Sequence, residues 1–217
     1  MAEDRPDWET MRRSAEAPVQ ARPGDHEEVA RTLSDAFAVD PLVDWFMRDD
    51  AGRDAARLRF FRRLVAMGAP QGRIDRPAGG GAAAIWMPFE WLGPTPLIAE
   101  LRSIPAMLAT TGWRRFSRLQ AVRVDMDRHH PMEHRHAYLW FLGVAPAAQG
   151  RGVGSALLRA ANARLDAEGL PAYLETGTTR NVALYRRHGY AVISEHKARP
   201  DAPTMWSMWR EPGASPG

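Results

Sequence analysis

The chain has 217 residues, of which 45% are hydrophobic, enough for the core of one domain of ordinary size. It contains no cysteine, which excludes disulfide frameworks, thiolate nucleophiles and cysteine-based zinc sites. The net charge is only +3, and 29 basic residues are mixed with 26 acidic ones, a balance that does not favour nucleic-acid binding.

The chain also lacks the patterns of a membrane or exported protein. No stretch reaches the roughly 20 apolar residues that a membrane span needs, and the first ten residues are acidic where a signal peptide would be basic and then apolar. We therefore expect a cytoplasmic protein that does not bind membranes. Residues 1–16 and 211–217 are polar and are predicted to be flexible tails on a single domain of residues 17–210.

The hydrophobic pattern predicts strands and helices that alternate around one mixed sheet, an α/β or α+β arrangement. A short strand over residues 18–22 precedes a helix that Pro41 ends. A second helix spans residues 54–68, the glycines at 79–81 form the turn of a hairpin, and residues 89–135 are mostly helical. The later elements are predicted as a strand over 136–144, a helix to about 167, a strand over 171–177, a helix over 181–189, and strands over 190–196 and 204–210.

A glycine-rich segment separates the strand at 136–144 from the helix that follows it. This arrangement is typical of anion binding, because the first N–H groups of a helix have no partner within it and carry a partial positive charge. Glycines at 150, 152 and 154 allow a polyphosphate to approach the backbone closely. Their spacing fits neither a P-loop nor the GxGxxG of dinucleotide-binding proteins. What remains is the pattern Q-x-x-G-x-G, which begins at Gln149.

With this pattern the chain resembles the GCN5-related N-acetyltransferase (GNAT) family, whose acetyl-CoA signature is R/Q-x-x-G-x-G/A between a strand and a helix. A second segment agrees, since Tyr185, Gly189 and Tyr190 match the family's Y-x-x-x-G-F/Y pattern on a later helix. The run "YLETGTTRNVALYRRHGY" is similar to the puromycin N-acetyltransferase branch, and that similarity covers roughly residues 16–213. One departure is Asn181, which lies closer to the tyrosine than the asparagine of the wider family does and is therefore also a candidate for capping its helix.

The resemblance implies the GNAT fold, a mixed and mostly antiparallel sheet of about seven strands flanked by helices, with a helical insertion between strands 3 and 4. It implies that acetyl-CoA binds through the backbone of the glycine-rich segment and the edge of the preceding strand, which Gly143 would allow to splay or bulge. The residues expected to bind acetyl-CoA are Leu142, Gly143, Val144, Gln149, Gly150, Arg151, Gly152, Val153, Gly154, Ser155, Asn181 and Tyr185.

The implied function is an N-acetyltransferase, an acyltransferase that passes the acetyl group directly to a primary amine of a small molecule. Antibiotic resistance by acetylation of a puromycin-like aminoacyl nucleoside is one form of this activity. The alternatives are the acetylation of a protein or peptide amine, and a non-catalytic sensor that binds acyl-CoA. The sequence leaves open the acceptor amine and whether the protein is a monomer or a homodimer.

Two residues are candidates for catalysis. The resemblance places Tyr185 beside the thioester sulfur, as a hydrogen-bond donor or general acid. Glu175 lies near the end of the predicted fifth strand, where the sheet of this fold opens between cofactor and acceptor, and it is the leading candidate for the general base. His136 is an alternative base, because strand alternation places it on one face with Tyr138 and Trp140. A chain of water molecules is the third possibility.

Aromatic residues gather in the regions that line the acceptor side in this family, although each of them also fits a hydrophobic core. The insertion at 89–135 is expected to cover this side, which favours an amine with apolar or aromatic surface. The residues expected to bind the acceptor are Phe37, Trp45, Trp86, Trp91, His136 and Tyr138.

The segment 129–136 holds four histidines and Glu133, a composition that invites a metal site. His130 and His134 would share a face only on a continuous helix, which Pro131 interrupts. We therefore predict no metal site and expect this segment to be a solvated loop over the active site.

Overall fold

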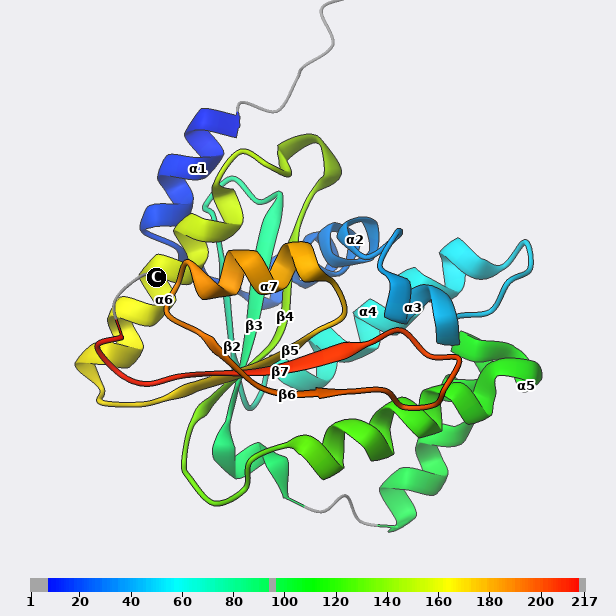
Figure 1. Cartoon of the computed structure of the whole chain (residues 1–217). Helices are drawn as coiled ribbons and strands as arrows, with labels where there is room; N and C mark the ends of the chain where they lie inside the picture. The colour runs from blue at the N-terminus through cyan, green and yellow to red at the C-terminus, as the bar shows by residue number, and fades with distance from the viewer. Residues whose placement is uncertain (1–7, 94–96, 215–217) are drawn as a thin grey trace, which may run out of the picture.

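The computed structural model describes residues 8–93 and 97–214. These residues form a seven-stranded sheet in the order β1-β2-β3-β4-β5-β7-β6 (Figure 1). Within it β4 and β5 are parallel, and every other neighbouring pair is antiparallel, which confirms the predicted mixed, mostly antiparallel sheet. The strands are β1 (Val19–Gln20), β2 (Arg73–Arg76), β3 (Ala82–Pro88), β4 (Ala137–Val144), β5 (Ala172–Thr176), β6 (Ala191–His196) and β7 (Met205–Arg210).

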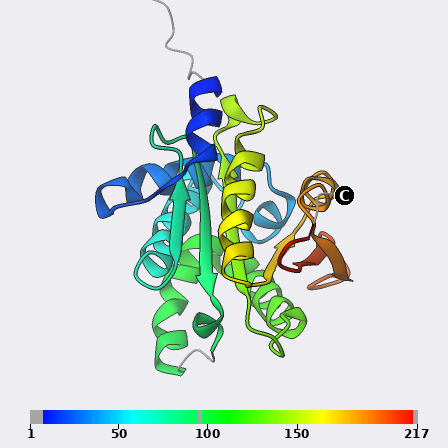
Figure 2. The same ribbon diagram turned by 90° about the vertical axis from the view of Figure 1, so that its left-hand side faces the viewer.

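Helices cover both faces of the sheet. Apolar side chains of α2 (His26–Ala36) and α4 (Arg53–Gly68) pack on one face, and those of α6 (Val153–Ala167) and α7 (Thr179–Arg186) pack on the other. In the side view of Figure 2 the strands β2 and β3 lie between α2 and α4 on one side and α6 on the other. The remaining helices are α1 (Trp8–Glu16), α3 (Pro41–Phe46) and α5 (Leu97–His129), and short 3-10 helices span Pro23–Asp25, Phe89–Leu92 and Pro146–Ala148.

The predicted helical insertion between β3 and β4 is α5. Gly112 has a φ of 64° and bends it, so α5 consists of two helical segments within the region predicted to be mostly helical. Leu119 and Val122 of its second segment pack into a separate small core with α3. No described helix has the length and apolar character that a bilayer crossing requires.

The strands β4 and β5 separate along their length. They pair only from Ala137–Leu139 to Ala172–Leu174, and beyond this point β4 remains bonded to β3 alone. A β-bulge lies in the same stretch of β4, where Trp140 is the extra residue between two pairs with β3. The bulge places Trp140 and Phe141 together on the α2/α4 face. The separated strands leave backbone on the β5 side of β4 available to a ligand.

Residues 8–16 do not form the predicted flexible tail. They form α1, which packs on α6 and buries Ala15 completely. Trp8, Met11 and Ala15 recur at helical spacing, a pattern that the polar composition hides. Residues 1–7 and 215–217 of the predicted tails lie outside the described residues.

Pro41 does not end the preceding helix as predicted. Helix α2 already ends at Ala36, and Pro41 is the first residue of α3, a position where its missing N–H removes no helical hydrogen bond. Asp40 caps α3, since its Oδ1 accepts hydrogen bonds from the N–H groups of Leu42 (3.0 Å) and Val43 (2.9 Å).

Candidate active site

The glycine-rich segment forms one wall of a cleft of about 450 Å³. Helix α6 begins directly after Gly152, whose φ of 82° lies in the left-handed region that glycine adopts without strain. Val153, Gly154 and Ser155 carry the first N–H groups of α6, and all three line the cleft. The N-terminus of a helix favours a phosphate group at this position.

All of the residues predicted to bind acetyl-CoA line this cleft, with the exception of Arg151. The guanidinium of Arg151 lies instead over the ring of Trp8, 5.1 Å from its centroid. Arg180 and Arg187 also line the cleft, and their positive charge suits an anionic ligand.

Asn181 does not cap α7. The cap is Thr178, whose Oγ1 accepts a hydrogen bond from the N–H of Asn181 at 3.2 Å. Asn181 itself lines the cleft, so its placement agrees with a position beside the cofactor.

The edge of β4 forms a second part of the cleft wall. Leu142, Gly143 and Val144 line it, in the part of β4 that has separated from β5. A Cβ on Gly143 would lie 2.7 Å from a methyl group of Leu33, so the glycine lets α2 pack closely on the strand. Of the two alternatives expected at Gly143, β4 does separate from β5 in this stretch, whereas the bulge lies at Trp140 and not at Gly143.

Tyr185 of α7 lines the same cleft and is 7% exposed. Burial, with a smaller contribution from the carboxylate of Asp40, raises the pKa of Tyr185 above its ordinary value. Its hydroxyl is therefore protonated at neutral pH and able to donate a hydrogen bond. Asp40 lines the cleft as well, and burial raises the pKa of its carboxyl.

Glu175 lies in a buried polar cluster and is absent from the residues that line the cleft. Its carboxylate accepts hydrogen bonds from the hydroxyls of Tyr138 (2.7 Å) and Tyr173 (2.9 Å). Burial raises the pKa of Glu175 to about 7, against the two hydroxyl bonds, which lower it. A carboxylate with this pKa is poised to take up and release a proton near neutral pH.

His130 and His136 belong to the same cluster. The Nδ1 of His130 lies 3.9 Å from a carboxylate oxygen of Glu175, and its Nε2 lies 2.9 Å from the Nε2 of His136. The Nδ1 of His136 is 2.7 Å from the carbonyl oxygen of His134, so this nitrogen is the protonated donor. Burial lowers the pKa of His130 to about 3 and also lowers the pKa of His136, so both rings are neutral at pH 7.

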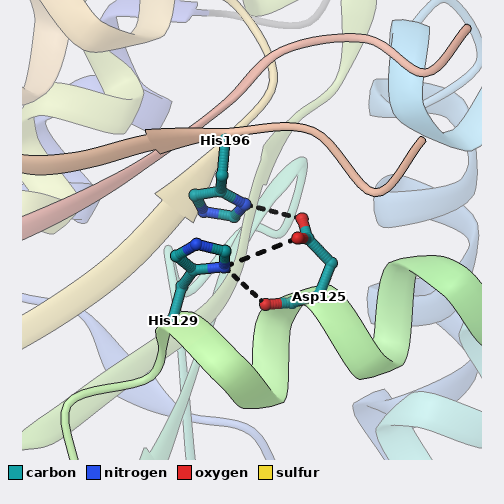
Figure 3. A group of neighbouring side chains, drawn as sticks. All are labelled: Asp125, His129 and His196. Atoms are coloured by element: carbon teal, nitrogen blue, oxygen red, sulfur yellow. Dashed lines mark hydrogen bonds and ion pairs between the residues drawn. The ribbon is translucent and has the colours of Figure 1, made fainter. Parts of the chain in front are cut away.

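A separate cluster of polar side chains, Asp125, His129 and His196, connects the end of α5 to β6 (Figure 3). Asp125, His129 and His196 offer ligand atoms within 4.8 Å of one another. Both ring nitrogens of His196 already have partners, because Nδ1 lies 2.6 Å from Asp125 Oδ2 and Nε2 lies 3.0 Å from Ser207 Oγ. The histidines predicted to form a solvated loop are thus largely built into the protein, with His136 fully buried.

The residues expected to bind the acceptor lie in different places. Phe37 lines the cleft, and Trp91 packs against Trp140 with ring centroids 4.8 Å apart. Trp45 is buried beside α5, and Trp86 is buried on the α6/α7 face, so the structure does not bring these two to the cleft. His136 and Tyr138 lie in the Glu175 cluster.

Residues 114–190 match the model of the acetyltransferase (GNAT) family. The matched segment includes the edge of β4, the glycine-rich loop and α7, which together line the cleft. A solved structure from Corynebacterium glutamicum, described as histone acetyltransferase HPA2 and related acetyltransferase, has a TM-score of 0.67 and 25% identity over 90% of this chain and 97% of that chain. The chain has the GNAT fold, and its segment 114–190 is similar to the acetyltransferases of the GNAT family.

Other solved GNAT proteins share the fold at lower identity. Polyamine N-acetyltransferase from Drosophila melanogaster has a TM-score of 0.57 and 18% identity over 89% of this chain and 98% of that chain. Arylalkylamine N-acetyltransferase 2 from Aedes aegypti has a TM-score of 0.60 and 11% identity over 89% of this chain and 97% of that chain. At these identities the likeness shows the GNAT fold alone.

Mycothiol acetyltransferase from Jonesia denitrificans is 42% identical to this chain over 65 residues. The match spans 29% of this chain and 21% of that relative. None of the proteins named here is a puromycin N-acetyltransferase, so the comparisons support the family and not that branch in particular.

Sequence reasoning missed several polar residues of the cleft and of the Glu175 cluster. Asp40 could have been found, because an aspartate directly before a proline is a typical start of a helix. Tyr173 could also have been found, since it lies two residues before Glu175 and shares its face of the strand. Ser207 and His196 carry no such signal, because β6 and β7 place them beside Tyr173 only in the folded chain.

Proposed function

We propose that this chain transfers the acetyl group of acetyl-CoA directly to a primary amine of a small molecule. One observation carries the proposal: the N-terminus of α6, the unpaired edge of β4 and the hydroxyl-bearing ring of Tyr185 line a single cleft. An anionic, extended thioester matches these three features in turn. The N–H groups of α6 would hold the pyrophosphate, and the edge of β4 would bond the pantetheine amides.

The reacting groups follow from this placement. A backbone N–H near Val144 would stabilise the oxyanion that develops on the thioester carbonyl. The hydroxyl of Tyr185 would donate a hydrogen bond to the leaving thiolate. Because the pKa of Tyr185 is raised, complete transfer of its proton to a thiolate with a pKa of about 8.5 is unfavourable. Tyr185 therefore acts mainly as a donor whose hydrogen bond strengthens as the thiolate forms.

Glu175 is the proposed general base. Its pKa of about 7 leaves a useful fraction of carboxylate at neutral pH. Since neither Glu175 nor its partner Tyr138 lines the cleft, the proton of the amine would reach Glu175 through water. Asp40 lies in the cleft itself and would attract the ammonium form of the acceptor.

The acceptor is proposed to be a small amine with apolar or aromatic surface. Phe37 contributes such surface to the cleft, and Pro41 lies beside it. A puromycin-like aminoacyl nucleoside, as in antibiotic detoxification, is one such amine, and a peptide N-terminus is the alternative acceptor. We place the activity in the cytoplasm, where acetyl-CoA is available, in a monomer or homodimer.

Release of the CoA thiol over a panel of amines tests the proposal. The panel includes an aminoacyl nucleoside, a polyamine, an arylalkylamine and a short peptide with a free N-terminus. We expect thiol release with at least one small amine, and roughly 100-fold lower kcat in Tyr185→Phe, the cost of removing one preorganised donor. Calorimetric binding of acetyl-CoA without thiol release from any amine would indicate a sensor, and absence of binding would contradict the proposal altogether.

A further inference from the structure

Glu175 is one end of a continuous series of hydrogen bonds that crosses the protein away from the cofactor cleft. The Oη of Tyr173 lies 2.9 Å from Glu175 Oε1 and 2.9 Å from Ser207 Oγ. The next bonds join Ser207 Oγ to His196 Nε2 at 3.0 Å and His196 Nδ1 to Asp125 at 2.6 Å. The buried hydrogen-bond series therefore consists of Glu175, Tyr173, Ser207, His196 and Asp125.

Four different elements supply this series, with His196 at the end of β6. Glu175 and Tyr173 project from the same face of β5, Ser207 pairs with Glu175 across the β5–β7 ladder, and Asp125 comes from the inserted helix α5. Tyr173 and Ser207 are completely buried, and the side chain of His196 is 4% exposed. Burial of so many polar groups is costly unless each is paired, so the continuity of the series is a built feature of the fold.

The outer end of the series opens to solvent. Asp125 lines a surface pocket of about 430 Å³ between α5 and the segment after β6, and no residue of this pocket also lines the cofactor cleft. In Figure 3 the ring of His196 points at the carboxylate of Asp125, and the ring of His129 stacks on the ring of His196. The centroids of the two rings are 3.8 Å apart. The side chain of His129 is about one-third exposed, so water reaches this end of the series.

We propose that the buried hydrogen-bond series is a proton relay, which carries to solvent at α5 the proton that Glu175 takes from the amine. The relay rests on the proposed function, because it requires Glu175 to act as the base. Each hydroxyl in the series has one proton to pass on and lone pairs to receive another, and a neutral imidazole accepts at one nitrogen while it donates at the other. These are the properties that proton transfer along a series needs.

During the transfer each hydroxyl of the series receives one proton and passes on one. Glu175 passes its proton to Tyr173 Oη, Tyr173 passes its own to Ser207 Oγ, and Ser207 passes its own to His196 Nε2. Glu175 is left as a carboxylate, ready for the next amine, and His196 is an imidazolium opposite the carboxylate of Asp125. The Nδ1 proton of His196 then leaves through Asp125 to water in the surface pocket. Rotation of the two hydroxyls and exchange of His196 from the Nε2–H back to the Nδ1–H tautomer restore the starting arrangement for the next transfer.

Other ionisable groups also face Glu175 and enter any pH dependence. They lie on α5, directly after it, and on β4 and β5, while the β7 residue that pairs with Glu175 is Ser207. They are Asp125 and Asp127 of α5, His130 after α5, Tyr138 of β4 and Tyr173 of β5.

Kinetics of thiol release test the relay. Ser207→Ala interrupts the series and His196→Ala removes its imidazole, and we expect each to lower kcat about tenfold, against about 100-fold or more for Glu175→Gln. Added imidazole is expected to restore kcat in His196→Ala, where it can occupy the vacated space, and not in Ser207→Ala. His129→Gln, which changes the neighbouring ring outside the series, is the control and should keep the original kcat. Unchanged kcat in both relay variants would overturn the proposal.

A second measurement needs neither activity nor a variant that must fold. In 15N-histidine NMR of the unchanged protein, neutral His196 is expected as the Nδ1–H tautomer, because only then does Nε2 accept the proton of Ser207. The Nε2–H tautomer would overturn the relay while leaving the proposed function untouched. Conversely, absence of thiol release with every amine counts against the proposed function, and the tautomer still tests the relay's geometry.

Discussion

The cofactor cleft and the Glu175 cluster meet where β4 separates from β5, but the cleft is formed mainly by backbone atoms and the cluster by side chains. The cleft presents backbone from the glycine-rich loop and the strand edge, so few side chains are needed to hold its ligand. The cluster presents paired side chains from β4, β5, β7 and α5, almost all of them buried. A site formed by backbone can be recognised from a short sequence motif, whereas a site formed by side chains depends on residues that are distant in the chain.

The difference predicts opposite sensitivities to change. In the cleft, conformation at a few glycines matters more than the identity of neighbouring side chains. In the cluster, the charge state of one carboxylate matters most, because the site is closed to bulk water. Each of the three experiments below changes one of these two regions. Each also has a control variant of the same kind at a position outside that region.

The largest expected effect is the pH dependence of stability at Glu175. Its pKa is about 7 in the folded protein and near 4.5 in the unfolded chain, so between these values the folded state holds a proton that the unfolded state releases. The contribution of Glu175 to the free energy of unfolding therefore falls as pH rises through this window. Glu175→Gln stays neutral, so its stability relative to the unchanged protein should rise by about 3 kcal/mol from pH 4.5 to above pH 7.

Urea unfolding at several pH values measures this difference. Glu195→Gln, which removes one carboxylate from an exposed position on β6, is the matched control. Equal pH slopes for the two variants would show that the Glu175 carboxyl is not held in a buried, proton-binding state.

The contrast between the backbone-lined cleft and the side-chain cluster also explains how much of each site the sequence could predict. The spacing of Gln149, Gly152 and Gly154 predicted the glycine-rich turn and the helix that follows it, because this geometry is local to the backbone. Periodicity likewise predicted the strands and most of the helices, but not α1 or α3. The start of α3 at Asp40 was missed, since Pro41 was interpreted as the end of the preceding helix and not as the beginning of a new one.

The Glu175 cluster was predicted only in part. Strand alternation made His136 and Tyr138 candidates, Glu175 was one from its place near the end of the predicted fifth strand, and the structure brings the three together. Ser207 and His196 joined them through the pairing of β5, β6 and β7, which no local pattern specifies. Trp45 and Trp86 were expected at the acceptor side, but aromatic residues fit a core equally well, and these two are in cores.

An intermediate effect is expected at Gly152. Alanine there must adopt a φ of 82°, which costs an L-residue about 1–2 kcal/mol, and relaxation of this strain would turn the first N–H groups of α6 away from the phosphates. We expect the Kd for CoA to rise about tenfold by calorimetry, the equivalent of about 1.4 kcal/mol.

Gly169→Ala is the control for Gly152→Ala. Gly169 follows α6 with a φ of 63° and has open space around it, so alanine there carries the same kind of strain at the other end of the helix. Both variants should lose similar stability, and only Gly152→Ala should lose CoA affinity. An equal Kd in the two variants would mean that the loop backbone does not hold the coenzyme.

The smallest effect is expected at Asp40, the carboxylate that lies in the cleft itself. Asparagine caps a helix as well as aspartate does, so Asp40→Asn keeps the start of α3 and removes only the charge. If Asp40 attracts the ammonium of the acceptor, KM for the amine should rise about fivefold, close to 1 kcal/mol, with kcat nearly unchanged. Asp44→Asn, on the exposed side of α3, controls for the loss of one negative charge. A fall of 100-fold or more in kcat, the size expected for loss of a general base, would instead transfer that role from the buried Glu175 to Asp40 and place the proton chemistry in the cleft.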